Sequence, residues 1–259
     1  MAFEFIRYEK SGRIAWITIN RPEVMNALHP PANLELSQAF DDFAADPESW
    51  VAIITGAGDK AFSAGNDLKY SASQGMGNIQ VGNGGFGGIT ARFDLFKPVI
   101  AAVNGFALGG GFEIALACDI IVAAEHARFG LPEPRVGLAA LAGGMQRLPR
   151  HLPLKIAMGY MLTGKQMTAA EAHRWGIVNE VVPASELRVA AERWANEILE
   201  CSPISVRVTK QVAMQSQGLP LEEALTRSYS LIGDLFRSED LMEGVMAFAQ
   251  KRKPEWKGK

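Results

Sequence analysis

The stretch Asn104-Gly105-Phe106-Ala107-Leu108-Gly109-Gly110-Gly111-Phe112-Glu113-Ile114-Ala115-Leu116-Ala117-Cys118-Asp119 links an apolar run, Val99 to Val103, to a short apolar helix. The run predicts a buried strand, and three glycines at the helix entrance indicate close backbone approach. Free N–H groups at a helix N-terminus, with the helix dipole, favour negative charge. Glu113 follows Gly110 by three residues and leans toward the same end. The stretch predicts an anion site facing a carboxylate, although a capping glutamate would give the same pattern.

Composition places the chain among ordinary globular proteins. Its 259 residues suit one large domain, or one domain with a smaller appendage, and 48% hydrophobic with 21% charged residues is typical. A net charge of -2 gives no reason to expect nucleic acid or an anionic membrane as a partner. Cys118 and Cys201 offer no disulfide framework or metal-ligand spacing. With no signal peptide or metal motif visible, we expect a cytoplasmic protein without a bound metal.

The chain changes character near Pro149. Before it, alternating and apolar runs predict a hairpin, a helix and several strands, which cover residues 5–10 with 14–19, 33–45, 51–55, 119–124 and 127–130. A helix is also predicted over 90–96. After Pro149, helical patterns dominate, over residues 154–162, 169–175, 184–200, 205–217, 221–236 and 239–250. The pattern predicts an α/β body followed by a helical tail.

Two glycine-rich segments need separate interpretation. Gly56, Gly58 and Ala61 fit a dinucleotide fingerprint, but no helix pattern opens there, so dinucleotide binding is not expected. Residues Ser71 to Gly88 hold seven glycines and predict a mobile surface loop.

Taken in order, several motifs resemble the crotonase (enoyl-CoA hydratase/isomerase) family over nearly the whole chain. They are Asn20-Arg21-Pro22, Met25-Asn26-Ala27-Leu28, Ala61-Phe62-Ser63-Ala64-Gly65-Asn66-Asp67-Leu68, Gly105 to Glu113, Phe129-Gly130-Leu131-Pro132-Glu133 and Gly143 to Pro149. The resemblance implies an α/β fold, the crotonase (ClpP/crotonase-like) spiral of ββα units. It also implies a core with the acyl-CoA site over residues 1–200, and a C-terminal helical trimerisation region over 201–259. A homotrimer or a dimer of trimers is expected.

By the same resemblance, the backbone N–H groups of Ala64 and Gly110 form an oxyanion hole for a thioester carbonyl. The substrate is an acyl-CoA thioester, so coenzyme A enters as part of the substrate and no separate cofactor is expected. Residues expected to contact the substrate or its coenzyme A are Val24, Met25, Ala64, Gly65, Asn66, Asp67, Leu68, Gly109 and Leu141. Leu141 and the Ser71 to Gly88 segment are expected to shape the acyl pocket.

Two glutamates indicate the reaction. Hydratases of the family carry both, and here they are Glu113 and Glu133. Hydration of a trans-2-enoyl-CoA to a 3-hydroxyacyl-CoA needs a base for water and an acid for Cα. We expect Glu113 to take the proton from water and Glu133 to deliver one. Dienoyl-CoA isomerases of the family use aspartates where this chain has Glu113 and Leu141, which argues against that chemistry.

Three other functions stay open at this level. The tail from Ser238 to Lys259 is also similar to carnitinyl-CoA dehydratases, which act on a cationic substrate. Ser63 is a conceivable nucleophile of a serine hydrolase, although no G-x-S-x-G motif surrounds it. A non-catalytic acyl-CoA binder is the third alternative, and the paired glutamates argue against it.

Overall fold

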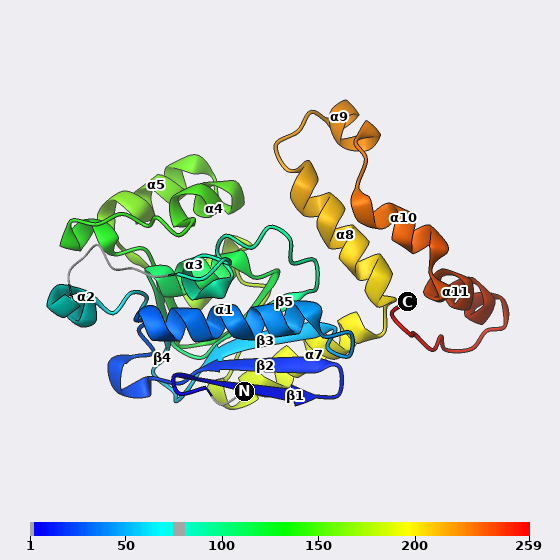
Figure 1. Ribbon diagram of the computed structural model, residues 1–259. Coiled ribbons are helices and arrows are strands. Elements are labelled where there is room, and N and C mark those ends of the chain that lie inside the picture. Colours follow the sequence, from blue (N-terminus) through cyan, green and yellow to red (C-terminus); the bar gives the residue numbers. More distant parts are fainter. Residues whose placement is uncertain (1–2, 75–80) are drawn as a thin grey trace.

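The computed structural model describes residues 3–74 and 81–259, and its body is built on a six-stranded sheet (Figure 1). The strand order is β1-β2-β3-β5-β7-β10, and only the β1–β2 hairpin is antiparallel. The strands are β1 (Ile6–Ser11), β2 (Ile14–Ile19), β3 (Val51–Gly56), β5 (Val99–Val103), β7 (Ile120–Ala124) and β10 (Glu180–Val182). The central strands are rich in Val, Ile and Ala because helices cover both faces of a parallel sheet.

A second, four-stranded sheet lies beside the first. Its order is β4-β6-β8-β9, with bounds β4 (Ala61–Ser63), β6 (Phe106–Leu108), β8 (Arg128–Gly130) and β9 (Gln166–Thr168). Each of β3, β5 and β7 in the first sheet is followed in the chain by a short strand in the second. A helix comes next, for example α3 (Gly110–Ala117) after β6. The predicted ββα repeat and α/β fold class are therefore confirmed.

Two apolar layers hold the body together. Helix α1 (Pro30–Ala45) covers one sheet face, and its Phe40 and Phe43 are fully buried in a core shared with Ile17. Helix α7 (Leu187–Leu199) covers the opposite face, where Ala191 joins a second cluster. Figure 1 shows α1 in front of the strands and α7 behind them. Burying one large apolar side chain stabilises a fold by roughly 1.5–3 kcal/mol, so these two layers stabilise the body of the protein.

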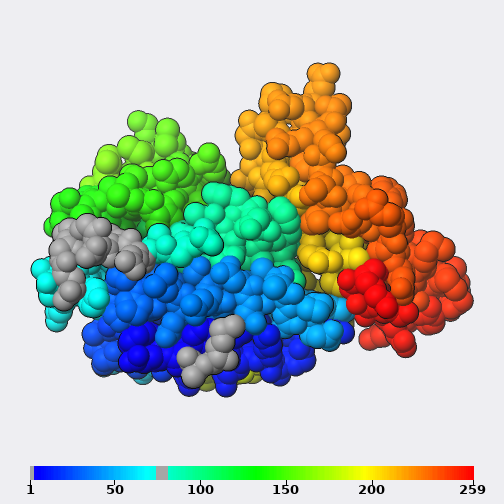
Figure 2. Space-filling model, viewed as in Figure 1, coloured from blue at the N-terminus to red at the C-terminus, as the bar shows by residue number. Residues whose placement is uncertain are grey.

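The remaining helical elements connect or extend this body. They are α2 (Leu68–Gln74), α4 (Gly144–His151), α5 (Leu154–Thr163), α6 (Ala169–Arg174), α8 (Pro203–Ser216), α9 (Leu221–Thr226), α10 (Ser230–Arg237) and α11 (Glu239–Ala249), with the 3₁₀ turns η1 (Pro22–Val24), η2 (Phe86–Gly88), η3 (Glu133–Val136) and η4 (Ala184–Glu186). Helices α9 to α11 extend away from the body, as the orange and red region of Figure 2 shows, whereas Lys210 on α8 pairs with Asp119 of the body at 2.7 Å. The predicted boundary at residue 200 falls between α7 and α8, and as a domain division it stays a prediction.

The C-terminal residues return to the base of this extension. The indole N–H of Trp256 donates to the Glu200 carbonyl at 2.8 Å. Asp240, almost fully buried, accepts the backbone N–H of Lys257 at 2.8 Å. The tail therefore ties α11 to the junction of α7 and α8. Within residues 3–74 and 81–259, no helix is both long and apolar enough to cross a bilayer.

Three helix predictions differ from the structure. The pattern over 221–236 divides into α9 and α10, because the chain extends at Arg227 and buries Tyr229, whose hydroxyl donates to Ala224. Residues 90–96 form turns rather than a helix, and the Thr90 carbonyl accepts a side-chain bond from Arg147. Helix α4 begins before Pro149 and contains it, which the strong breaker signal of proline concealed.

The two strands that follow Pro149, β9 and β10, were also missed. Each spans three residues, too short for an alternating pattern to show, and each pairs at the edge of its sheet.

The glycine-rich segment is only partly the loop that was predicted. Residues Leu68–Gln74 form α2, whereas residues 75–80 lie outside the described part of the chain. Phe86, Gly87 and Gly88 are buried, and Gly88 approaches the backbone of α1 so closely that a Cβ would lie 2.6 Å from the Ser37 nitrogen. The glycines here allow a wall of the core to form against α1.

Candidate active site

Glu113 lies on the first turn of α3 and points into the protein. Gly109 precedes the helix with a φ of 54°, and Glu113 is only 3% exposed. Its Oε1 accepts the backbone N–H of Gly144 at 2.8 Å. Burial raises the pKa of Glu113 to about 7; the Gly144 N–H acts against this rise, and the negative charge of Glu133 adds to it. A carboxyl with a pKa near neutrality can exchange protons at physiological pH.

Glu133 reaches the same region from η3. A Cβ placed on Gly109 would lie 3.1 Å from Oε1 of Glu133, so the carboxyl rests against the entrance of α3. Burial also raises the pKa of Glu133. Among the described residues, no group hydrogen-bonds its buried Oε2. A buried carboxyl oxygen without a protein partner is suited to bind water or substrate. The structure brings the two predicted catalytic residues together.

Gly110 provides the N–H end of α3. The first N–H groups of a helix have no partner within it, so the Gly110 N–H can serve a ligand. The ring of Phe86 lies directly against Gly110, and a Cβ there would collide with it. The segment carrying Gly65 borders the same point, since a Cβ on Gly65 would lie 2.7 Å from the Gly110 nitrogen. The predicted oxyanion loop and the helix entrance are therefore neighbours.

The second predicted oxyanion donor needs correction. The N–H of Ala64 donates to the Met25 carbonyl at 3.0 Å, so it is already used within the protein. Leu28 pairs with Gly65 and Asp67 on either side of Asn66, at 2.7 and 2.9 Å. This parallel bridge turns the Asn66 N–H away from Leu28. Within the described part of the chain, that N–H has no acceptor, so Asn66 fits the role better than Ala64.

Of the other predicted contact residues, some hold the loops together and others lie exposed on the surface. Val24 and Met25 form the η1 turn, where Met25 has a φ of 57°, and both are half-buried. Asp67 is paired with Arg21 at 3.0 Å and accepts the Tyr70 N–H, so its carboxylate is used internally. Leu68 is exposed, and Leu141 is 80% exposed. A single chain therefore does not enclose Leu141 as an acyl-pocket wall.

Sequence reasoning missed the residues that hold these turns. The buried side chain of Asn26 accepts from the Arg21 N–H and donates to the carbonyls of Ala57 and Ala61. It thereby shapes the Met25 turn and the approach to Ala64. Gly144 and Arg147 act similarly around Glu113. An asparagine after a turn and a Gly-Gly pair before an arginine were visible in the sequence, but their partners are distant in the chain.

Ser63 is not placed as a nucleophile. Its side chain is fully buried, and its hydroxyl donates to the Asn26 carbonyl at 2.8 Å while accepting the Gly65 N–H. The hydroxyl is a structural link in the loop. This geometry argues against the serine hydrolase alternative.

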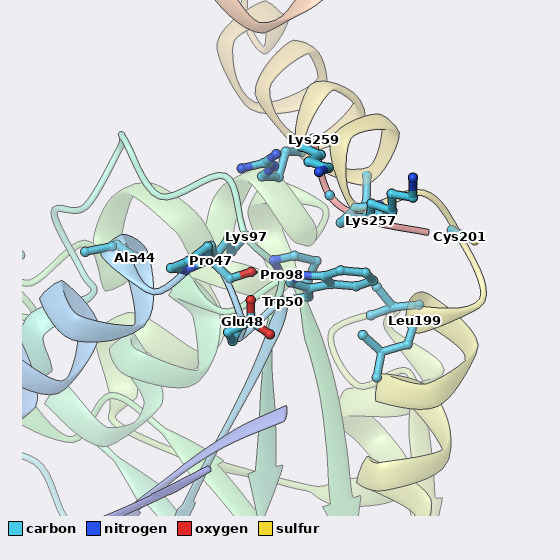
Figure 3. A pocket seen from close by; sticks show the side chains of 16 residues that line it. Ala44, Pro47, Glu48, Trp50, Lys97, Pro98, Leu199, Cys201, Lys257 and Lys259 are labelled. Atoms are coloured by element: carbon cyan, nitrogen blue, oxygen red, sulfur yellow. Dashed lines mark hydrogen bonds between the residues drawn. The ribbon is translucent and has the colours of Figure 1, made fainter. Parts of the chain in front are cut away.

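A separate cavity of about 360 Å³ lies at the far end of α1. Figure 3 shows Trp50, Lys97 and Lys257 around it, and neither Glu113 nor Glu133 lines it. Glu48, which lines it, pairs with Arg13. This cavity lacks the paired acid and base of the α3 site. Over the described ranges, no group of three or more His, Cys, Asp or Glu residues could hold a metal ion.

Known proteins resemble this chain over nearly its whole length. A family model described as Enoyl-CoA hydratase/isomerase matches residues 9–259. A carnitinyl-CoA dehydratase of Salmonella arizonae is 46% identical over 259 residues, covering 98% of this chain and 99% of that protein. A carnitinyl-CoA dehydratase of Salmonella typhi is 45% identical over 260 residues, covering 99% of each.

Solved structures give the same result at the level of the fold. An enoyl-CoA hydratase from Mycobacterium tuberculosis H37Rv has a TM-score of 0.92 and 40% identity, covering 98% of this chain and 99% of that one. An enoyl-CoA hydratase from Bacillus anthracis has a TM-score of 0.90 and 34% identity, covering 99% of this chain and all of that one. From its fold, its paired glutamates and these similarities, the chain belongs to the crotonase (enoyl-CoA hydratase/isomerase) family.

Proposed function

We propose that the protein is an enoyl-CoA hydratase that adds water reversibly to a trans-2-enoyl-CoA. The observation that carries this proposal is the pair of buried carboxyl groups, Glu113 and Glu133, beside the N–H end of α3. The reaction requires one base and one acid around a single water, together with stabilisation of an enolate-like oxygen. The site offers groups for each of these tasks.

In the proposed mechanism, the thioester oxygen accepts hydrogen bonds from the N–H groups of Gly110 and Asn66. In other enzymes, removing one donor of this kind raises the activation free energy by about 2.7–4 kcal/mol. Glu113, held at Oε1 by Gly144, takes a proton from water in its ionised form as the oxygen adds to Cβ. Glu133, whose pKa burial also raises, delivers a proton to Cα.

Coenzyme A contacts are proposed for the loops that frame this oxygen. Val24 and Met25 belong to one, and Gly65, Asn66 and Leu68 to the other. The first lies at the C-terminal end of η1, and the second leads into the N-terminus of α2. Asp67 contributes by holding Arg21 and not by direct contact.

A second candidate is a carnitinyl-CoA dehydratase, which the names of the curated relatives favour. That reaction is the same elimination on a substrate with a positive charge. The turn from residue 137 to residue 147 has no acidic side chain, and it ends at Arg147, whose positive charge reaches Glu113. This charge distribution favours an uncharged acyl chain.

The test is turnover across a set of enoyl thioesters that contains crotonyl-CoA, a six-carbon analogue and crotonobetainyl-CoA. Loss of the enoyl absorbance measures hydration, and we expect the highest kcat/KM with an uncharged chain. A clear preference for crotonobetainyl-CoA would replace the proposal by the dehydratase. Binding of every thioester without turnover would favour the non-catalytic binder.

We also propose a homotrimer or a dimer of trimers in the cytoplasm. Helices α9 to α11 expose large apolar side chains in the single chain, among them Leu221, Leu225, Phe236, Met242, Val245 and Phe248. Surfaces of this kind commonly mark protein–protein contacts. The two cysteines, neither of them in a disulfide, agree with a reducing compartment.

A further inference from the structure

Arg147 lies on the first turn of α4 and is half-buried beside the active site. Its Nη2 donates to the Thr90 carbonyl at 2.8 Å, and its Nη1 donates to the Ala142 carbonyl at 3.4 Å. Within the described part of the chain, it forms no ion pair with a carboxylate. The guanidinium therefore links two backbone segments while keeping its charge uncompensated by a direct partner.

One of these segments holds Glu113. The turn from Ala142 to Gly144 ends in the N–H that donates to Oε1 of Glu113 at 2.8 Å. Gly143 has a φ of 106°, and a Cβ on it would collide with Nη1 of Arg147. The guanidinium covers the turn on one side while the turn presents its N–H groups to the carboxylate on the other.

The second segment shapes the oxyanion end. Thr90 follows η2, whose Phe86 ring lies against Gly110. The Gly87 N–H is held by Asn33 at 2.7 Å, and Arg147 holds the next part of the segment through Thr90. One side chain thus connects the turn behind the base with the wall beside the oxyanion donor.

Charge links Arg147 to Glu113 as well. Burial raises the pKa of Glu113, and the positive charge of Arg147 acts against that rise. The other titratable or charged groups around the pair are Glu133 from η3, Cys118 after α3, and Arg150 and His151 on α4. Among these neighbours, Arg147 is the cation whose charge acts directly on Glu113.

We propose that Arg147 is the positioning residue of the general base: it fixes the Ala142 to Gly144 turn against Glu113 and, through Thr90, the segment beside Gly110. Arg147 acts through Glu113 and through the backbone, without touching the substrate. This inference rests on the proposed hydratase function, and it names the residue that positions the base of that reaction.

The experiment compares three variants of the full chain: Arg147→Met, Arg147→Lys and the control Arg150→Met. Arg150 lies one turn further along α4, is exposed, and hydrogen-bonds only within that helix. The kcat/KM for crotonyl-CoA is measured against pH. In Arg147→Met, we expect a roughly tenfold lower kcat and an unchanged KM. We also expect the rising limb of the pH profile to shift to higher pH by about half to one unit.

Arg147→Lys separates the two roles, because lysine keeps the charge but cannot hold both carbonyls. We expect its pH limb to stay near that of the wild type while kcat falls several-fold. Arg150→Met should change neither quantity. An unchanged limb in Arg147→Met, or an equal shift in Arg150→Met, overturns the proposal.

A second measurement does not depend on turnover. Carbon-13 NMR of glutamate carboxyls, assigned with Glu113→Gln, reports the titration of Glu113 in each variant. We expect a higher midpoint in Arg147→Met than in the wild type, and an unchanged midpoint refutes the inference. A wild type that hydrates no enoyl-CoA contradicts the proposed function alone, since this titration still tests the support of Glu113 by Arg147.

Discussion

Glu113, the proposed base, shows at the residue scale how the surroundings of a carboxyl set its pKa. Burial raises its pKa to about 7, while the Gly144 N–H and Arg147 favour its charged form. The residue can therefore be ionised or neutral near physiological pH. Such balance suits a base that must accept a proton and release it again within one cycle.

The first prediction concerns the pH dependence of the reaction. The kcat/KM for crotonyl-CoA should rise as pH increases through about 7, because Glu113 accepts a proton only when ionised. It should fall again at higher pH, because Glu133 must carry the proton that it delivers to Cα, and burial raises its pKa. Rates measured across buffers from about pH 5 to about pH 10 check this. A profile that is flat through neutrality contradicts the assignment of Glu113 as the base.

The second prediction concerns stability. A carboxyl whose folded pKa of about 7 exceeds its ordinary value of 4.5 binds its proton more tightly in the folded state. Folding stability is then lost as pH rises between those values, by up to about 3 kcal/mol. Glu113→Gln keeps the acceptor for Gly144, so it should melt at a higher temperature than the wild type at about pH 8 and nearly match it at about pH 5. Equal melting temperatures at both pH values would disprove the cost of burying this charge.

The third prediction separates activity from folding. Glu113→Gln and Glu133→Gln should each lower kcat by at least about 100-fold with unchanged circular dichroism, because each removes one proton carrier. Glu125→Gln, which changes an exposed glutamate just after β7, serves as the matched control and should retain activity. Near-normal turnover in either active-site variant would show that the reaction does not use the paired carboxyls.

Helix α3 illustrates the element scale, since its entrance contacts several parts of the chain at once. Gly110 faces the flexible ring of Phe86, whereas Gly111 faces the backbone carbonyl of Ser63. A ring can move aside, but a strand carbonyl cannot without disturbing its sheet. The run of glycines thus serves close packing and the anion site together.

The fourth prediction follows from that contrast. Gly111→Ala should lower the free energy of unfolding by several kcal/mol, because its Cβ collides with the Ser63 carbonyl. Gly110→Ala should lower the free energy of unfolding by less, because the Phe86 ring can move aside. It should nevertheless lose activity, since the displaced ring disturbs the proposed oxyanion site. Gly159→Ala, in open space within α5, should stabilise the protein by roughly 0.5–1 kcal/mol. Denaturant unfolding of the three variants tests this order, and equal effects would contradict it.

At the scale of the whole molecule, helices α8 to α11 extend from the body with apolar side chains exposed. Their base is tied to the body where Ser202 donates to Asp240 and Trp256 donates to the Glu200 carbonyl. An extension of this shape gains stability when its apolar faces meet other copies.

The fifth prediction tests that assembly. Leu225→Asp combined with Phe236→Asp should lower the mass in light scattering after gel filtration from the trimer or hexamer to that of one chain. Both side chains are more than two-thirds exposed in the single chain, and burying a charge at an apolar contact is costly. Val189→Asp, an equally exposed position on α7, is the control and should keep the wild-type mass. A double variant with the wild-type mass would exclude α9 and α10 from the interface.

The sequence by itself determined the features that depend on neighbours in the chain. The hairpin, the apolar strands, most helices and the glycine entrance of α3 followed from local spacing and residue type, and the two glutamates from the resemblance to the crotonase family. Tertiary structure alone decided which backbone donor is available, because Ala64 is engaged by Met25 and Asn66 is not. It also decided which carbonyls Arg147 binds and where the chain breaks between α9 and α10. Those outcomes depend on contacts between residues far apart in the chain, where a hydrogen bond or a buried ring outweighs local preference.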